Sequence, residues 1–128
     1  MRLLLDTHAF LWWVGNNDAL SKKARAAIAD ADNECFLSIA STWELAIKLS
    51  LGKLKLPEPI ERFVPAQLAA NGFVQLPIEF RHAAKVATLS LHHRDPFDRL
   101  LIAQAIEEKM PIVSGDAMFK RYGVNRIW

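Results

Sequence analysis

Four acidic residues in this sequence are spaced so that a fold could gather them at one site: Asp6, Glu44, Asp98 and Asp116. Two carboxylates 4 Å apart repel each other by about 4 kcal/mol at an effective dielectric constant near 20, so a cluster of them requires either a proton or a cation. Ligands that are all oxygen suit magnesium or manganese better than zinc. Such a site can orient a phosphodiester and lower the pKa of a bound water for in-line attack. The four residues therefore predict a metal site whose ligands also serve catalysis.

The elements that would position these acids alternate between strand and helix, which predicts an α/β fold with a central parallel sheet flanked by helices. Apolar runs predict strands over 3–5, 35–39, 73–76, 110–114 and 124–128, and helical spacing and caps predict helices over 8–14, 21–31, 41–52, 59–71, 81–91, 95–109 and 118–122. In such a sheet, ligands bind beyond the carboxyl ends of the strands. Asp6 ends the first strand and Asp116 follows the fourth. Glu44 and Asp98 fall in the first turns of helices that can begin at the same edge.

Each of these acids also has a purely local explanation. Asp6 could cap the helix that follows it, and Asp116 could serve a Gly-Asp turn. Glu44 could be the reciprocal partner of Ser41 in a capping box, with or without a metal role. Asp98 could stabilise its helix through the helix dipole, typically by 0.3–1 kcal/mol. Taken alone, Asp6 is better explained as a cap, and only the combination of the four favours a metal site.

Length and composition predict one domain, residues 1–128, of an ordinary globular protein. The single cysteine, Cys35, excludes an internal disulfide and fits a reducing compartment. The apolar run 9–14 is far shorter than the roughly 20 residues of a membrane span, and a carboxylate after three leucines interrupts any signal-peptide core. We therefore expect a cytoplasmic protein without membrane contact. The net charge is only +2, but 16 basic residues would outnumber the acids left once four are neutralised by metal, which favours a polyanionic substrate.

Several charged residues lie close in the sequence to Asp98, and most of them are basic. Asp95 directly precedes a proline and is predicted to be the N-cap of the helix, rather than a ligand. His92 and His93 lack the Cys/His spacing of a zinc site. We expect both to be exposed loop residues that approach the phosphates of RNA. Arg94 and Arg99 are either solvated charges at a helix end or phosphate contacts.

These motifs together resemble the PIN domain. The resemblance rests on Asp-Thr after the first strand, Glu44 early in a helix, Asp98 opening a helix that continues Arg-Leu-Leu-Ile-Ala-Gln-Ala, and Ser-Gly-Asp ending at Asp116. It extends over nearly the whole chain. The most specific piece is the run His-His-Arg-Asp-Pro-Phe-Asp-Arg at 92–99, which resembles a bacterial group of VapC-type toxins of type II toxin–antitoxin systems.

The resemblance implies a PIN-like three-layer sandwich and an endoribonuclease dependent on Mg²⁺ or Mn²⁺, with the four matching acids as metal ligands and catalytic residues. It further implies an RNA substrate, a cognate antitoxin protein and a homodimer. Candidate substrate-binding residues are Ser114, Arg94, Arg99 and His92. The leucines and lysines of 48–56 are either core residues or contacts to the antitoxin or a second copy.

Two other functions are compatible with a parallel sheet and clustered acids. A receiver-like phospho-acceptor signalling domain would need an acidic pair after the first strand and a lysine near the end of the last, and neither is evident here. A non-catalytic PIN-fold binding module would keep the fold for partner contacts alone. All four acids are present, which speaks against the second alternative, although acids by themselves do not demonstrate turnover.

Overall fold

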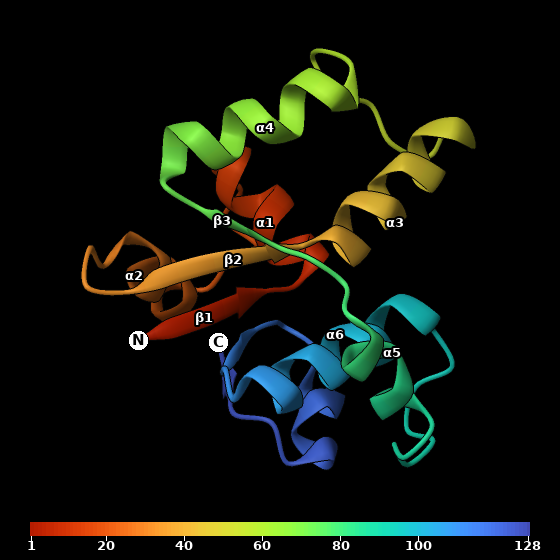
Figure 1. The fold of residues 1–128 in the computed structure, drawn as a ribbon. Helices are drawn as coiled ribbons and strands as arrows, with labels where there is room; N and C mark the ends of the chain where they lie inside the picture. Colours follow the sequence, from red (N-terminus) through yellow and green to blue (C-terminus); the bar gives the residue numbers. More distant parts are fainter.

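A five-stranded, entirely parallel sheet forms the centre of the protein, in a computed structural model that describes residues 1–128 (Figure 1). The strands are β1 (Arg2–Leu5), β2 (Glu34–Ser38), β3 (Val74–Leu76), β4 (Ile112–Val113) and β5 (Arg126–Ile127), in the order β3-β2-β1-β4-β5. Leu4 of β1 stands opposite Phe36 of β2 and Ile112 of β4. The fold confirms the predicted α/β class with a parallel sheet.

Helices cover both faces of this sheet, and the leucines of β1 explain why. Leu3 and Leu5 point into a core with α1 (Thr7–Val14), α2 (Lys22–Ala29) and α4 (Ile60–Asn71). Leu4 points the other way, into a core with α6 (Pro96–Glu108) and the 3₁₀ helix η1 (Ala117–Tyr122). All three leucines are fully buried, as expected for a central parallel strand that is covered on both faces. None of the helices is long and apolar enough to cross a membrane.

The helix α3 (Ile39–Ser50) begins three residues earlier than the predicted capping box required. Ser38 is its N-cap: the side chain accepts from the backbone N–H of Ala40 at 3.0 Å and bonds to Gln104 of α6. Ser41 is fully buried inside the first turn, and Glu44 lies in the second. The predicted Ser41–Glu44 capping box is therefore wrong, because a serine at the very end of β2 provides the cap first.

The helix α5 (Phe80–Val86) is shorter than the predicted 81–91, because its end is stabilised from outside the helix. The guanidinium of Arg99 donates to the carbonyls of Val86, Leu89, Ser90 and His93 at 3.1–3.5 Å. Carbonyls that would otherwise continue the helix are satisfied by this side chain. Residues 87–95 consequently form a loop that leads to α6.

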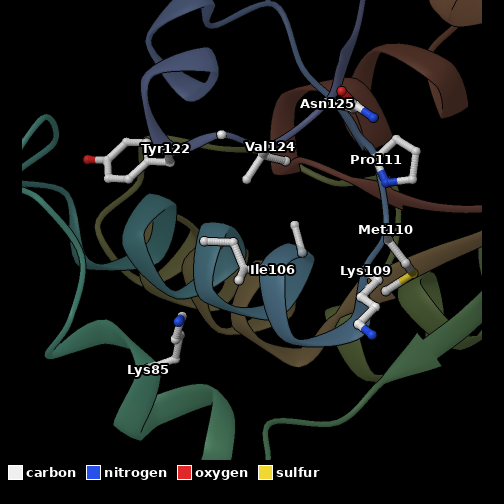
Figure 2. A pocket seen from close by; sticks show the side chains of 10 residues that line it. Lys85, Ile106, Lys109, Met110, Pro111, Tyr122, Val124 and Asn125 are labelled. Carbon is white, nitrogen blue, oxygen red and sulfur yellow. The ribbon is translucent and has the colours of Figure 1, made fainter.

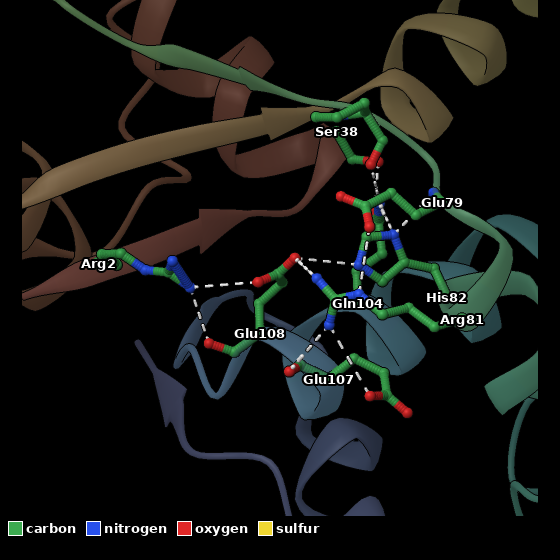
Figure 3. A network of polar contacts seen from close by, with 9 residues as sticks. Arg2, Ser38, Glu79, Arg81, His82, Gln104, Glu107 and Glu108 are labelled. Carbon is green, nitrogen blue, oxygen red and sulfur yellow. Dashed lines mark hydrogen bonds and ion pairs between the residues drawn. The ribbon is translucent and has the colours of Figure 1, made fainter.

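A network of polar contacts fixes α5 against α6 and β1 (Figure 3). His82 is fully buried, and its Nδ1 accepts from the backbone N–H of Glu79 at 3.0 Å. Its other ring nitrogen lies 3.2 Å from Glu108, which also binds Arg81 and Arg2. This network holds both ends of the hairpin formed by α5, the 87–95 loop and α6, and the first turn of α6 carries Asp98.

Candidate metal centre

All four acids selected from the sequence line one pocket of about 360 Å³. Asp6 follows β1, Asp116 lies three residues beyond Val113, the last residue of β4, and α3 and α6 contribute Glu44 and Asp98. The remaining lining residues are Thr7, His8, Lys48, Asp95 and Phe119. The pocket lies at the carboxyl edge of the sheet, where a parallel α/β fold places its ligands. The topology thus brings together residues that are up to 110 positions apart in the chain.

Asp6 combines a structural role with a place in the pocket. Its Oδ1 accepts from the backbone N–H of Ala9 at 2.7 Å, so it caps α1 as the local explanation required. The side chain is almost completely buried, and burial raises the pKa of its carboxyl above the ordinary value, against the lowering effect of hydrogen bonds from Ser114 and Ala9. A cap leaves further lone pairs on the carboxylate, so both roles are compatible.

Asp98 has the most perturbed carboxyl of the pocket. Burial raises its pKa to about 7, and the negative charges of Asp95, Glu44 and Asp6 act in the same direction. Near neutral pH and without a cation, a substantial fraction of this carboxyl is therefore protonated. A dication at the same place would favour the ionised form and remove the repulsion. The burial of Asp98 and the three acidic side chains around it thus fit a divalent metal at this place.

Glu44 is held by two partners. Its Oε1 accepts from the Thr7 hydroxyl at 2.7 Å, and Lys48 Nζ lies 3.1 Å from Oε2, one turn further along α3. The Thr7 hydroxyl shares a second hydrogen bond, of 2.9 Å, with Ser41. The Asp-Thr pair after β1 therefore links the first strand to α3 as well as supplying an acid.

Asp116 is the N-cap of η1, and each of its two carboxylate oxygens has one hydrogen-bond partner. Oδ1 accepts from the backbone N–H of Met118 at 2.9 Å, and Oδ2 lies 2.7 Å from His93 Nε2. Burial alone would raise the pKa of this carboxyl, but the hydrogen bonds from His93 and Met118 hold it below its ordinary value. The preceding Gly115 allows a close approach, because a Cβ there would lie 3.1 Å from the Trp128 ring.

His93 is the residue that the sequence analysis missed. One ligand atom each from His93, Asp98 and Asp116 lies within 4.8 Å of the others. The prediction that both histidines are exposed is wrong: His92 is half-buried, and the side chain of His93 is only 9% exposed. The signal was present in the sequence, since His93 belongs to the 92–99 run that carries the most specific resemblance. Adjacency to His92 gave no reason to distinguish the two rings.

Comparison with known proteins agrees with this geometry. A family model described as "PIN domain" matches residues 3–125. The chain belongs to the PIN-domain family, within its VapC-type group. It is 32% identical over 120 residues to Ribonuclease VapC22 of Mycobacterium tuberculosis, covering 94% of this chain and 91% of that protein. A 40% identical match to Ribonuclease VapC16 of the same organism spans 52% of this chain and only about half, 47%, of that protein.

Solved structures confirm the PIN fold. VapBC2 from Rickettsia felis, bound to a promoter DNA fragment, aligns with a TM-score of 0.72 at 16% identity over 100% of both chains. VapBC-1 from nontypeable Haemophilus influenzae aligns with a TM-score of 0.66 at 15% identity, over 98% of this chain and 96% of that chain. FitAcB from Neisseria gonorrhoeae gives 0.63 at 18% identity, over 97% and 95%. At these identities the likeness concerns the fold, and the three-layer PIN-like architecture is confirmed.

The candidate substrate-binding residues of this PIN domain lie in different surroundings. Ser114 is buried and accepts from the backbone N–H of Asp116 at 3.0 Å, so it orients the acid. Arg94 is exposed, whereas Arg99 is committed to the carbonyls at the end of α5. His92 packs edge-on against Tyr122 with ring centroids 4.9 Å apart. A substrate contact of these four residues remains a prediction, and Arg94 is the one whose side chain is exposed.

The largest pocket of the PIN domain is elsewhere (Figure 2). It measures about 520 Å³ and lies at the amino ends of β4 and β5, beside residues such as Lys85, Lys109 and Asn125. None of the four acids lines it. The chemistry of the residues, rather than the size of the cavity, therefore identifies the candidate site.

Proposed function

We propose that this PIN domain is an endoribonuclease dependent on Mg²⁺ or Mn²⁺ and the toxin component of a toxin–antitoxin pair. The observation that carries the proposal is the convergence of four carboxylates in one pocket, with the pKa of Asp98 raised to about 7 by burial and by its acidic neighbours. The names of the relatives, Ribonuclease VapC22 and Ribonuclease VapC16, support RNA as the substrate. The single cysteine, which excludes an internal disulfide and fits a reducing compartment, supports a cytoplasmic location.

In the proposed mechanism, Asp6, Asp98 and Asp116 would hold the metal directly, with Glu44 completing the site. A metal bound there would supply an activated water and neutralise charge on the phosphodiester. The residues of the chain do the positioning. Ser114 orients Asp116, and Thr7 and Lys48 fix Glu44 from either side. Arg94, exposed at the start of the α6 segment, is a candidate contact for a substrate phosphate.

A protein partner is part of the proposal. The solved VapBC2 and VapBC-1 neighbours support a cognate antitoxin. The helix α3 and its C-cap residue expose Trp43, Ile47 and Leu51, whose exposed fractions are 56%, 36% and 62%. Apolar side chains at this spacing form a stripe along one helix face, which an antitoxin or the second copy of a homodimer would cover.

Of the two alternative functions, the receiver-like domain is excluded by topology. Its doubly wound sheet has the strand order 2-1-3-4-5, whereas this sheet has the order β3-β2-β1-β4-β5. The non-catalytic PIN-fold binding module stays open as the alternative that an activity measurement must address.

The decisive experiment measures cleavage of bacterial RNA by the purified protein with Mg²⁺, Mn²⁺, Zn²⁺ or chelator. We expect cleavage with the first two ions and none with chelator. Asp98→Asn is the matched inactive variant and Glu58→Gln, at an exposed position outside the pocket, the matched control. Full activity of rigorously metal-free protein would refute the mechanism, and a folded, metal-loaded protein inert on all RNA would favour the binding module.

A further inference from the structure

The loop before α6 holds a hydrogen-bonded chain that ends on a metal-site carboxylate. Tyr122, at the end of η1, places its hydroxyl beside three nitrogen atoms of the loop. The distances are 3.1 Å to the backbone nitrogen of His92, 2.8 Å to that of His93, and 3.1 Å to His93 Nδ1. At the other side of the same ring, Nε2 lies 2.7 Å from Asp116 Oδ2.

The directions of these bonds follow from counting donors and acceptors. A phenol oxygen has two lone pairs and one proton. Both backbone N–H groups can only donate, so together they occupy the two lone pairs of Tyr122. The remaining O–H must then donate to His93 Nδ1, which is consequently without a proton. In the neutral ring the proton is on Nε2, directed at the carboxylate of Asp116.

We infer that His93 is a positioning residue that donates a hydrogen bond to Asp116, with its tautomer fixed by Tyr122, and that His93 is not itself a metal ligand. Coordination through Nε2 would require the proton on Nδ1. That proton would then point at a Tyr122 oxygen whose lone pairs are already used. The inference rests on the proposed metal-dependent function, because it concerns Asp116 as a ligand.

Asp116 needs such a partner more than its neighbours do. Its side chain is 41% exposed, whereas that of Glu44 is 12% exposed. An exposed aspartate samples several rotamers, and a cation that binds it must select one. The bond from His93 and the bond from Met118 together leave one orientation with lone pairs on both oxygens available to a cation. Edge contacts of the His93 ring with Phe119, at a centroid distance of 5.1 Å, restrict the donor itself.

The first test reads the tautomer directly by long-range ¹⁵N–¹H NMR of protein labelled at histidine, with His93→Gln identifying the signal. We expect the Nε2–H tautomer of His93 in metal-free protein and again after saturation with Mg²⁺. An Nδ1–H tautomer in the metal-free protein would overturn the assignment. A change to Nδ1–H on addition of Mg²⁺ would make His93 a ligand and would overturn it equally.

The second test measures Mn²⁺ affinity by calorimetry. Loss of an outer-shell partner typically weakens metal binding by about 10–100-fold, and we expect a loss in this range for His93→Ala and Tyr122→Phe. His93→Gln should bind close to the parent, because a glutamine amide can donate from near the Nε2 position. Thr88→Ala, which removes an exposed hydroxyl bonded to Lys85 in the same loop, should have no effect.

The two tests separate this inference from the proposed function. If His93→Ala binds Mn²⁺ as tightly as the parent, the positioning role of His93 is overturned, whereas the proposed nuclease function is unaffected. If the parent itself binds neither Mn²⁺ nor Mg²⁺, the metal-dependent function fails. The tautomer of His93 in the metal-free protein still decides whether Tyr122 fixes the ring.

Discussion

The raised pKa of Asp98 makes the metal-free protein less stable at high pH than at low pH. In the unfolded chain this carboxyl loses its proton near pH 3.8, whereas in the folded protein it keeps the proton up to about pH 7. Between these values the folded state binds more protons than the unfolded state, so the free energy of unfolding falls as the pH rises. Above about pH 7 the carboxyl is ionised in both states, and the free energy of unfolding falls no further on its account. Asp98→Asn should remove the contribution of Asp98 to this pH dependence.

The size of the effect follows from the shift. Each pKa unit corresponds to 1.36 kcal/mol, which gives an upper bound of about 4 kcal/mol for the ionised Asp98 carboxyl. The side chain is only partly buried, and solvent screening reduces this to about 1–3 kcal/mol. For a chain of this size, 1 kcal/mol corresponds to about 3–4 °C in Tm. Asp98→Asn should therefore raise the Tm of metal-free protein at pH 8 by about 3–12 °C.

The assay is thermal melting followed by circular dichroism at pH 5 and pH 8, with chelator or with Mg²⁺. In chelator the parent should melt lower at pH 8 than at pH 5. The difference in Tm between parent and Asp98→Asn should fall to less than half at pH 5, where the carboxyl of the unfolded chain is already largely ionised, and should vanish only at about pH 3. Mg²⁺ should raise the Tm of the parent at pH 8, because a ligand that binds only the folded state stabilises it. The variant should gain much less, since it lacks one ligand.

Glu58→Gln serves as the control, because it removes an exposed acid that lines no part of the pocket. It should follow the parent at both pH values. An Asp98→Asn variant that melts no higher than the parent in chelator at pH 8 would refute the reasoning. Such a result would mean that the carboxyl is already stabilised by the protein and needs no cation.

Three further predictions concern the same site and its supports. Glu44→Gln should keep the Tm in chelator but cut RNA far more slowly at limiting Mg²⁺, and normal cleavage by this variant in a magnesium titration would exclude Glu44 from the site. Ser38→Ala, which removes the true N-cap of α3, should in contrast lose about 1 kcal/mol of stability. Arg99→Lys should lower the urea midpoint by an amount equivalent to about 1–3 kcal/mol, because one ammonium cannot serve the carbonyls that the guanidinium serves; an unchanged midpoint would show that those carbonyls find water instead. Induced expression of the parent should arrest bacterial growth and Asp6→Asn should not, and a soluble, folded Asp6→Asn that is as toxic as the parent would exclude Asp6 as a ligand.

The sequence was sufficient for the features that depend on local chemistry. Three consecutive leucines before Asp6 predict a buried parallel strand, because only a strand covered on both faces is apolar at every position. Asp95 before a proline predicts the N-cap of α6, and it accepts from the backbone N–H groups of Phe97 and Asp98. Gly72 stops α4 in the left-handed conformation, as its residue type indicates. The strand–helix alternation then places Asp6 and Asp116 at one edge of the sheet.

Tertiary structure decided those features for which two residues of the same type were equally suitable by sequence. Ser38 and Ser41 are both suitable N-caps, and Ser38 is used because its hydroxyl also reaches Gln104, 66 residues away. The position of Glu44 in the second turn of α3 follows from that choice.

The role of His93 was hidden for the same reason. Two adjacent histidines are alike in sequence, but only one ring lies between Tyr122 and Asp116, 29 and 23 residues further along the chain. The pKa of Asp98 likewise depends on burial and on the charges of Glu44 and Asp6, which lie in two distant segments of the chain. Hydrogen bonds and desolvation across such separations leave no periodic pattern in the sequence, because they arise only once the sheet has brought the elements together.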